Sequence, residues 1–171
     1  KAIVPRPGCR LVEMDYSGLE VFIAACYHQD PTMMKYLTDP STDMHRDMAS
    51  ELFAVDGAEV TKAIRHAAKN RFVFPTFYGS YWKSTAPNLW EVVNLPTVSG
   101  ELVRDCLDQV GVEDLGIPGK FDPVSKRTTP SPGYYAFMQK VDERFWGKRF
   151  PKYKQWRDDY YASYLSNGFC V

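Results

Sequence analysis

Three cationic side chains recur at helical spacing between residues 62 and 69. Arg65 and Lys69 stand four residues apart, and Lys62 lies close to both on a regular helix, so the three share one stripe. Like charges placed in this way repel, but the stripe becomes favourable when a polyanion such as a triphosphate lies along it. Phe72 falls on the same side and could stack on a base or a sugar. The alternative is a solvated basic face beside an aromatic core stripe.

The charge of the chain is unevenly distributed, although its net charge is zero. Residues 60–90 contain five basic side chains and no acidic ones, namely Lys62, Arg65, Lys69, Arg71 and Lys83. Nothing in the same segment neutralises them, which strengthens the anion-binding hypothesis.

Two further residues have types suited to phosphate chemistry. Asp15 follows the apolar run Leu11–Met14, which predicts a strand ending at a carboxylate, where a divalent cation could be held with help from the Tyr16 carbonyl. His45 follows Ser41-Thr42-Asp43 in the first turn of an expected helix. By itself, each has an ordinary alternative: a turn-forming aspartate and a surface histidine.

The elements that must position these residues are mostly helices. Ser17-Gly18-Leu19-Glu20 has the form of a capping box, and the apolar run after it predicts a helix that ends at Asp30-Pro31. Apolar spacing predicts a second helix over 44–53. A cap at Asp56 or Thr61 precedes a third helix over 62–74, which Pro75 should kink or end.

The second half of the chain predicts short helices over 84–118 and a mobile loop or insertion over 116–133, which contains four prolines. Residues 134–166 are helical and aromatic in pattern, with a break at Phe150-Pro151 and a stop at Asn167-Gly168. Residues 169–171 are expected to begin a strand. The fold class is therefore mainly α with short β pieces.

Composition excludes several classes of protein. The chain of 171 residues is 44% hydrophobic and 25% charged, and no window is apolar enough for a membrane span. We therefore expect an intracellular, cytoplasmic protein. The four cysteines form no CxxC pair, which favours reduced, buried thiols over a zinc site or disulfides.

Four stretches in order resemble the A family of DNA polymerases. VPRPGCRLVEMDYSGLEVFIAACYHQDP looks like motif A, whose family form is close to DYSQIE. DMHRDMASELF is similar to the segment at the edge of the fingers, and RHAAKNRFVFPTFYGS looks like motif B. RFPKYKQWRDDYYASYLSNGFCV resembles the stretch that runs toward the next palm strand.

The resemblance implies a role for each matching position. Asp15, with the Tyr16 carbonyl, would hold the paired Mg²⁺ ions that activate the primer hydroxyl and stabilise pyrophosphate. Arg65, Lys69 and His45 would grip the nucleotide's phosphates. Glu20 would exclude a ribose 2′-hydroxyl, which favours DNA over RNA synthesis and separates this chain from single-subunit RNA polymerases. Phe74 and Tyr78 complete the nucleotide-binding set.

Two departures affect the site. Gly18 stands where the family usually has glutamine, and Lys69 to Tyr78 spans nine positions instead of the family's eight. The stacking position then falls on Val73 when counted forward and on Phe74 when counted back. A one-residue π-bulge before Pro75 would reconcile the two counts, so we predict Phe74, with Phe72 as the alternative.

The resemblance further implies the fingers plus part of the palm of a right-hand polymerase, of bacteriophage type. Residues 1–30 would be palm, 31–165 fingers, and 166–171 the start of a returning palm strand. Partners would be primer-template DNA, dNTPs and the remaining palm, thumb and possible 3′-5′ exonuclease domains. Because the family's second catalytic aspartate has no counterpart here, we expect no synthesis by this chain alone. The alternatives are a non-catalytic nucleic-acid-binding module and a small helical interaction domain.

Overall fold

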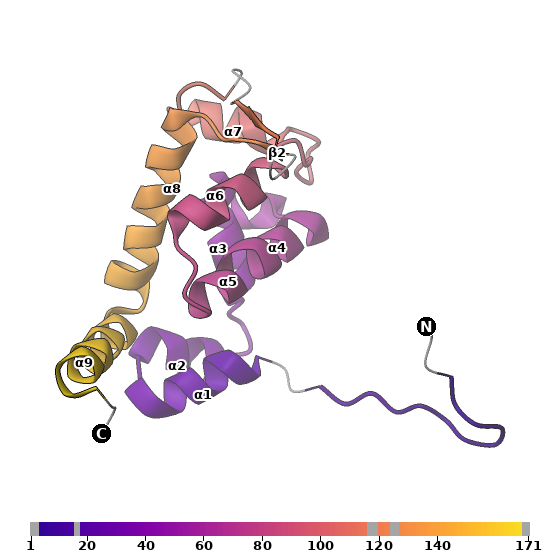
Figure 1. The fold of residues 1–171 in the computed structure, drawn as a ribbon. Helices are drawn as coiled ribbons and strands as arrows, with labels where there is room; N and C mark the ends of the chain where they lie inside the picture. The colour runs from indigo at the N-terminus through magenta and orange to yellow at the C-terminus, as the bar shows by residue number, and fades with distance from the viewer. Residues whose placement is uncertain (1–3, 16–17, 116–119, 124–126, 169–171) are drawn as a thin grey trace.

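The computed structural model describes residues 4–15, 18–115, 120–123 and 127–168, and it is mainly helical, as predicted. Helices in the first half lie close together in Figure 1. They are α1 (Leu19–His28), α2 (Pro31–Thr38), α3 (Met44–Phe53), the 3₁₀ turn η1 (Gly57–Glu59), α4 (Lys62–Ala68), the π-helical turn η2 (Lys69–Val73), α5 (Phe74–Phe77) and α6 (Trp82–Trp90).

The second half places two long helices beside this group (Figure 1). Its elements are α7 (Val103–Gln109), β1 (Phe121–Asp122), β2 (Arg127–Thr128), α8 (Pro132–Arg144), the π-helical turn η3 (Phe145–Arg149) and α9 (Pro151–Asn167). The predicted break at Phe150-Pro151 is confirmed, and Gly168 ends α9 in the left-handed conformation with a φ of 72°. Glycine suits that position because it has no Cβ to clash.

Residues 4–15 extend away from the helices, and the predicted strand over 10–15 is absent from this segment (Figure 1). Leu11, Val12 and Met14 are all exposed. A strand needs a partner to satisfy its backbone hydrogen bonds, and none of the described residues pairs with this segment. The prediction of a strand over 10–15 was therefore wrong, because this segment pairs with no described residue.

The β content of the described residues is small. β1 and β2 form a two-residue antiparallel ladder within the predicted loop over 116–133, and Pro96 and Leu102 form an isolated bridge. The expected strand at 169–171 lies outside the described residues. The cysteine prediction was partly wrong, since Cys9 and Cys26 are exposed while Cys106 is buried.

Helix α3 has the bounds that its sequence predicts. Asp43 caps it by accepting hydrogen bonds from the backbone N–H groups of His45 and Arg46, both at 3.1 Å. Its inward face is buried and packs against α4, with Met44, Met48, Ala49, Leu52 and Phe53 contributing to the core. This packing brings the first turn of α3 beside the basic helix.

The predicted helix over 62–74 is one continuous rod, which we call the α4–α5 rod, and it changes from α-helix to π-helix and back to α-helix. Thr61 caps α4, whereas Asp56 caps the separate turn η1. The π turn η2 follows, and the rod continues through α5 to Phe77 instead of ending at Pro75. Pro75 is tolerated because it stands in the first turn of α5, next to a π turn that already departs from the regular hydrogen-bond ladder.

Aromatic rings form much of the core where this rod meets α8, η3 and α9. Phe145 contacts Phe72 and Phe77 edge-on, with ring centroids 5.4 and 5.9 Å apart. Phe150 packs against Phe145 at 5.1 Å. These contacts bury one side of η2 and α5 and leave the other side free to face α1 and α3.

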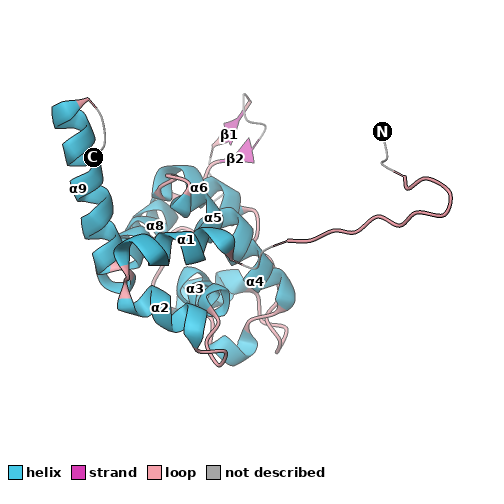
Figure 2. Ribbon diagram, turned by 90° about the horizontal axis from the view of Figure 1, so that it is seen from below, coloured by secondary structure: helices cyan, strands magenta, loops and turns pink. Residues whose placement is uncertain are grey.

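A single carboxylate joins the starts of two helices. Asp30 is fully buried, and its Oδ1 accepts from the backbone N–H groups of Thr32 and Met33 at the start of α2. Its Oδ2 accepts from those of Lys152 and Tyr153 at the start of α9. Asp30 therefore couples the direction of α9 to that of α2. Figure 2 shows α9 projecting from the other helices.

Candidate functional site

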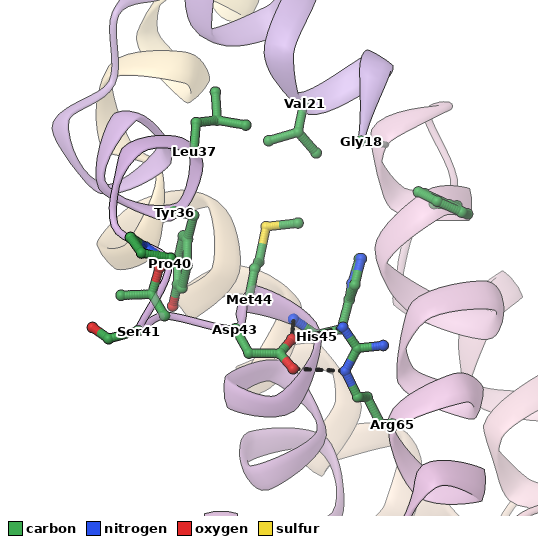
Figure 3. Close-up of a pocket in the computed structure, with 12 residues that line it drawn as sticks. Gly18, Val21, Tyr36, Leu37, Pro40, Ser41, Asp43, Met44, His45 and Arg65 are labelled. Atoms are coloured by element: carbon green, nitrogen blue, oxygen red, sulfur yellow. Dashed lines mark hydrogen bonds and ion pairs between the residues drawn. The ribbon is translucent and has the colours of Figure 1, made fainter. Parts of the chain in front are cut away.

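Two of the three predicted phosphate-binding residues, His45 and Arg65, line a pocket of about 480 Å³ between α1, α2, α3 and the α4–α5 rod (Figure 3). The third, Lys69, is not a lining residue and lies against the ring of Phe74, which does line it. His45 comes from the first turn of α3, Arg65 from α4, and Phe74 from the start of α5. The other lining residues are Gly18, Val21, Tyr36, Leu37, Pro40, Ser41, Thr42, Asp43 and Met44. Residues separated by tens of positions in the sequence are thus brought to one cavity.

Arg65 is held by a partner that the sequence did not reveal. Its Nε donates to Asp43 Oδ2 at 2.7 Å and its Nη2 donates to Asp43 Oδ1 at 3.0 Å (Figure 3). Asp43 was recognised only as part of a helix-start signal, and its link to a residue 22 positions away has no local pattern. Two parallel bonds of this kind fix the plane of a guanidinium.

The basic segment is less isolated than its sequence suggests. Arg71 donates through Nη1 to Glu91 at 2.9 Å and to the backbone oxygen of Asn88 at 2.6 Å. Together with the Arg65–Asp43 pair, this contact corrects the expectation that no acidic group neutralises residues 60–90, because the partners lie just outside that range or on another helix. Lys62 is exposed at the start of α4.

His45 is kept uncharged at neutral pH. Burial, followed by the charges of Arg65 and Lys69, lowers its pKa to about 4, and the nearby Asp43 only partly opposes this. Its ring meets Phe74 edge-on with centroids 5.9 Å apart, and Nδ1 has no hydrogen-bond partner among the described residues. A neutral imidazole still offers one N–H donor, so His45 can bind an anion as a hydrogen-bond donor instead of as a cation.

The π turn places Phe74 beside the cations. Lys69 Nζ lies 5.0 Å from the centroid of the Phe74 ring, within the range of a cation–π contact. Phe72 and Val73 are fully buried. The predicted π-bulge is therefore present, and Phe72 was wrongly expected on the cationic face, because the bulge begins before it and turns its ring into the core.

Glu20 and Tyr78 come together although they are 58 positions apart. The Tyr78 hydroxyl donates to Glu20 Oε1 at 2.8 Å, which joins the start of α1 to the end of α5. Two hydrogen bonds to the Glu20 carboxylate hold its pKa below its usual value: the larger effect comes from the Glu20 backbone N–H, and the second from the Tyr78 hydroxyl. In the described part of the chain, α1 begins after Gly18, which has a φ of 65° and no side chain to cap with, whereas the predicted capping box depends on Ser17. Ser17 lies outside the described residues.

The opposite wall of the pocket is braced by Tyr36. Its hydroxyl donates to Asp47 at 2.6 Å and accepts from Arg149, whose other nitrogen donates to Glu51. Burial and the Asp47 carboxylate raise the Tyr36 pKa well above its usual value, so the hydroxyl stays protonated. This network ties α2, α3 and η3 together behind the pocket.

The predicted metal site is not assembled by the part of the chain that the structure describes. Asp15 is exposed in the extended segment, and Tyr16 lies outside the described residues. Among the described residues, no group of three His, Cys, Asp or Glu side chains could hold a metal ion. Asp15 is an oxygen donor of the kind that Mg²⁺ prefers, but one carboxylate supplies only part of such a site.

Comparison with known proteins identifies the family. Residues 1–94, more than half of the chain, match DNA polymerase family A. The chain belongs to DNA polymerase family A. The matched region of this family A chain contains every residue predicted to act on the nucleotide, from Asp15 to Tyr78, and ends shortly after α6.

Two curated relatives of this family A chain are bacterial DNA polymerases I. The enzyme of Caldicellulosiruptor bescii is 36% identical over 69 residues, which is 40% of this chain and 8% of that protein. The enzyme of Borreliella burgdorferi is 34% identical over 70 residues, 41% of this chain and 8% of that protein. The match thus spans about a twelfth of each relative. No solved structure matches the chain.

None of the helices that the structure describes is long and apolar enough to cross a membrane.

Proposed function

We propose that this chain provides the nucleotide-binding face of a DNA-directed DNA polymerase, which transfers a nucleotide from a dNTP to a primer 3′-hydroxyl. The observation that carries the proposal is the convergence of Arg65, His45 and Phe74 on one pocket, with Lys69 against the Phe74 ring. Charge, hydrogen-bond donors and an aromatic face are the three elements needed to hold a nucleoside triphosphate.

Each side chain would act on a different part of the nucleotide. Lys69 and the guanidinium of Arg65 would neutralise the phosphates, while His45 would donate a neutral hydrogen bond. The ring of Phe74 would stack on the base or sugar. Glu20, held by Tyr78 at 2.8 Å, would stand where a ribose 2′-hydroxyl would otherwise fit, and so favour deoxynucleotides.

Asp15 would hold Mg²⁺ together with the Tyr16 carbonyl. When bound, a pair of such ions lowers the pKa of the primer hydroxyl and stabilises the leaving pyrophosphate. Since this chain offers one of the two carboxylates that the family resemblance calls for, the second would come from further palm sequence. We accordingly propose residues 1–30 and 166–171 as palm and 31–165 as fingers, working with a thumb and primer-template DNA.

Nucleotide binding gives the direct test. Titration of the 171-residue chain with a fluorescent dATP analogue should show that Lys69→Ala weakens binding about tenfold, because a charge-assisted contact is lost. Lys69 lies against Phe74, which lines the pocket, whereas Lys148 is an exposed lysine on η3 that belongs to neither the lining nor the predicted set, so Lys148→Ala is the matched control. Equal affinities for wild type, Lys69→Ala and Lys148→Ala would overturn the assignment of the pocket.

Catalysis is tested separately by primer extension. The chain alone should give no extension, and the polypeptide that carries it together with the remaining palm should lose synthesis on Asp15→Asn. DNA binding without any dATP binding, with no effect of Asp15→Asn on function, would instead support the non-catalytic nucleic-acid-binding module.

A further inference from the structure

Asp43 occupies a junction between two of the elements that form the pocket. Its carboxylate accepts four hydrogen bonds: two from the backbone N–H groups that begin α3, one of them that of His45, and two from the Arg65 side chain on α4. Its side chain is 32% exposed, and that of Arg65 is 37% exposed. The pair therefore lines the pocket instead of lying beneath it.

The geometry of these bonds leaves part of Arg65 available. Asp43 takes the edge formed by Nε and Nη2, and a guanidinium carries five N–H donors, including those of Nη1. The backbone N–H groups and the helix dipole at the start of α3 also stabilise the negative charge of the Asp43 carboxylate. Asp43 can thus orient Arg65 without cancelling its attraction for a second anion.

The Asp43 carboxyl is ionised at neutral pH. Burial opposes ionisation, but the Arg65 side chain and the Arg46 backbone N–H outweigh it and hold the pKa of Asp43 below its usual value. A fixed anion in a pocket for phosphates would by itself repel the ligand. We therefore look for a role of the Asp43 carboxylate that outweighs this repulsion.

We propose that Asp43 is a positioning residue that sets Arg65 and His45 at a fixed separation for the terminal phosphates of the dNTP. The inference rests on the proposed nucleotide-binding function and extends it to a residue outside the predicted set. One carboxylate fixes both groups: it holds the Arg65 plane through two bonds and the His45 backbone through a third. Selectivity for a triphosphate over a monophosphate then depends on Asp43.

The sign of the effect of Asp43→Asn separates this role from simple electrostatics. An asparagine that keeps its oxygen at the Oδ1 position can still cap α3 and accept from Arg65 Nη2, but its NH₂ group then faces the Nε donor in place of Oδ2. One of the two parallel bonds is lost, so the plane of the guanidinium is no longer fixed. If Asp43 contributed only negative charge, its removal would strengthen dATP binding. Positioning predicts the reverse, a loss of about tenfold in dATP affinity with little change for dAMP.

The experiment measures dATP and dAMP affinity for wild type, Asp43→Asn, Arg65→Ala and the double variant of the 171-residue chain. If Asp43 acts through Arg65, Asp43→Asn should have no further effect in the Arg65→Ala background. Asp56→Asn is the matched control, because Asp56 also caps a helical turn but is exposed and outside the pocket. Thermal unfolding verifies that each variant is folded.

The outcomes distinguish this inference from the function on which it rests. Wild type that binds no dATP would overturn the proposed function and the inference with it. Wild type that binds dATP, with Asp43→Asn equal to or tighter than wild type, would overturn the inference alone. Equal losses for dATP and dAMP that persist in the Arg65→Ala background would also overturn it, since they indicate a general effect on the fold.

Discussion

At the scale of single residues, the protonation state of His45 depends on groups from another helix. His45 stands on α3, while the cations that help to lower its pKa to about 4, Arg65 and Lys69, stand on α4 and η2. Burial acts in the same direction. The sequence located His45 as a candidate but could not predict that it is neutral, because both causes arise only when the helices pack.

The depressed pKa of His45 makes stability depend on pH. Protonation favours the unfolded chain, where the pKa is near 6.5, so the contribution of neutral His45 is complete above that value and is lost as pH falls toward about 4. Unfolding by urea should show that His45→Gln removes on the order of 2 kcal/mol of this pH dependence. Burial lowers the pKa of His28 as well, so part of the slope between pH 6.5 and 4 will remain.

The control for this measurement is His66→Gln, because His66 is exposed on α4. That variant gives the slope after an exposed imidazole is lost, against which the slope of His45→Gln is compared. Identical slopes for wild type and His45→Gln would show that His45 titrates normally in the folded chain.

At the scale of elements, the π turn η2 explains why the spacing of motif B departs from the family by one residue. Lys69 and Phe74 are five positions apart, and residues at that spacing share a face in a π-helix, whereas residues four apart share one in an α-helix. The π turn η2 accommodates the extra residue within a single turn of the helix. The flanking helices therefore keep their contacts on both sides.

We expect deletion of Asn70, which is exposed in η2, to be tolerated. The deletion would make Lys69 and Phe74 four apart in a regular α-helix, so Phe74 would stay on the cationic side.

Deletion of Lys140, an exposed residue inside α8, should instead turn the rest of that helix by about 100° and expose its apolar face. Circular dichroism and thermal melts compare the two. A melt for the Asn70 deletion as low as that for the Lys140 deletion would argue against the bulge as a one-residue insertion.

Asp30 gives a second prediction for the elements, because it caps α2 and α9 at once. Asp30→Ala loses both caps and should reduce the free energy of unfolding by about 3 kcal/mol, given roughly 1 kcal/mol for each cap and more for a buried site. Asp30→Asn keeps one acceptor oxygen and should lose about half as much. Urea denaturation measures both, with Asp108→Ala, which removes an exposed carboxylate on α7, as the control close to wild type. Equal losses for the alanine and asparagine variants would contradict a shared cap.

Local signals were sufficient for some of these elements and not for others. The bounds of α3 follow from the Asp43 cap and the apolar spacing after it, both of which are encoded within a dozen residues. Phe74 was found by counting along motif B. The strand over 10–15 was wrong because a strand depends on a distant partner, and Asp43–Arg65 and Asp30–Lys152 were missed because each joins residues far apart in the sequence.

At the scale of the whole molecule, α1 and α9 expose large apolar side chains. Phe22 is 55% exposed and Tyr27 is 72% exposed on α1, while Leu165 is 80% exposed on α9. The two helices contact each other, and Tyr27 and Trp156 lie 6.2 Å apart between ring centroids. The exposed apolar side chains of these two helices, which we call the α1–α9 face, are of the kind that proteins usually cover.

We expect the 171-residue chain to self-associate through this face when studied by itself. Light scattering coupled to size exclusion should show a mass that rises with protein concentration, because removing apolar surface from water favours association. Leu165→Lys combined with Tyr161→Lys should reduce this rise, since both positions are exposed on α9. Val98→Lys tests specificity, because Val98 is 63% exposed in the loop before α7 and belongs to neither helix. A mass that is independent of concentration, or one that Val98→Lys lowers as much as the α9 variant does, would show that the α1–α9 face does not drive association.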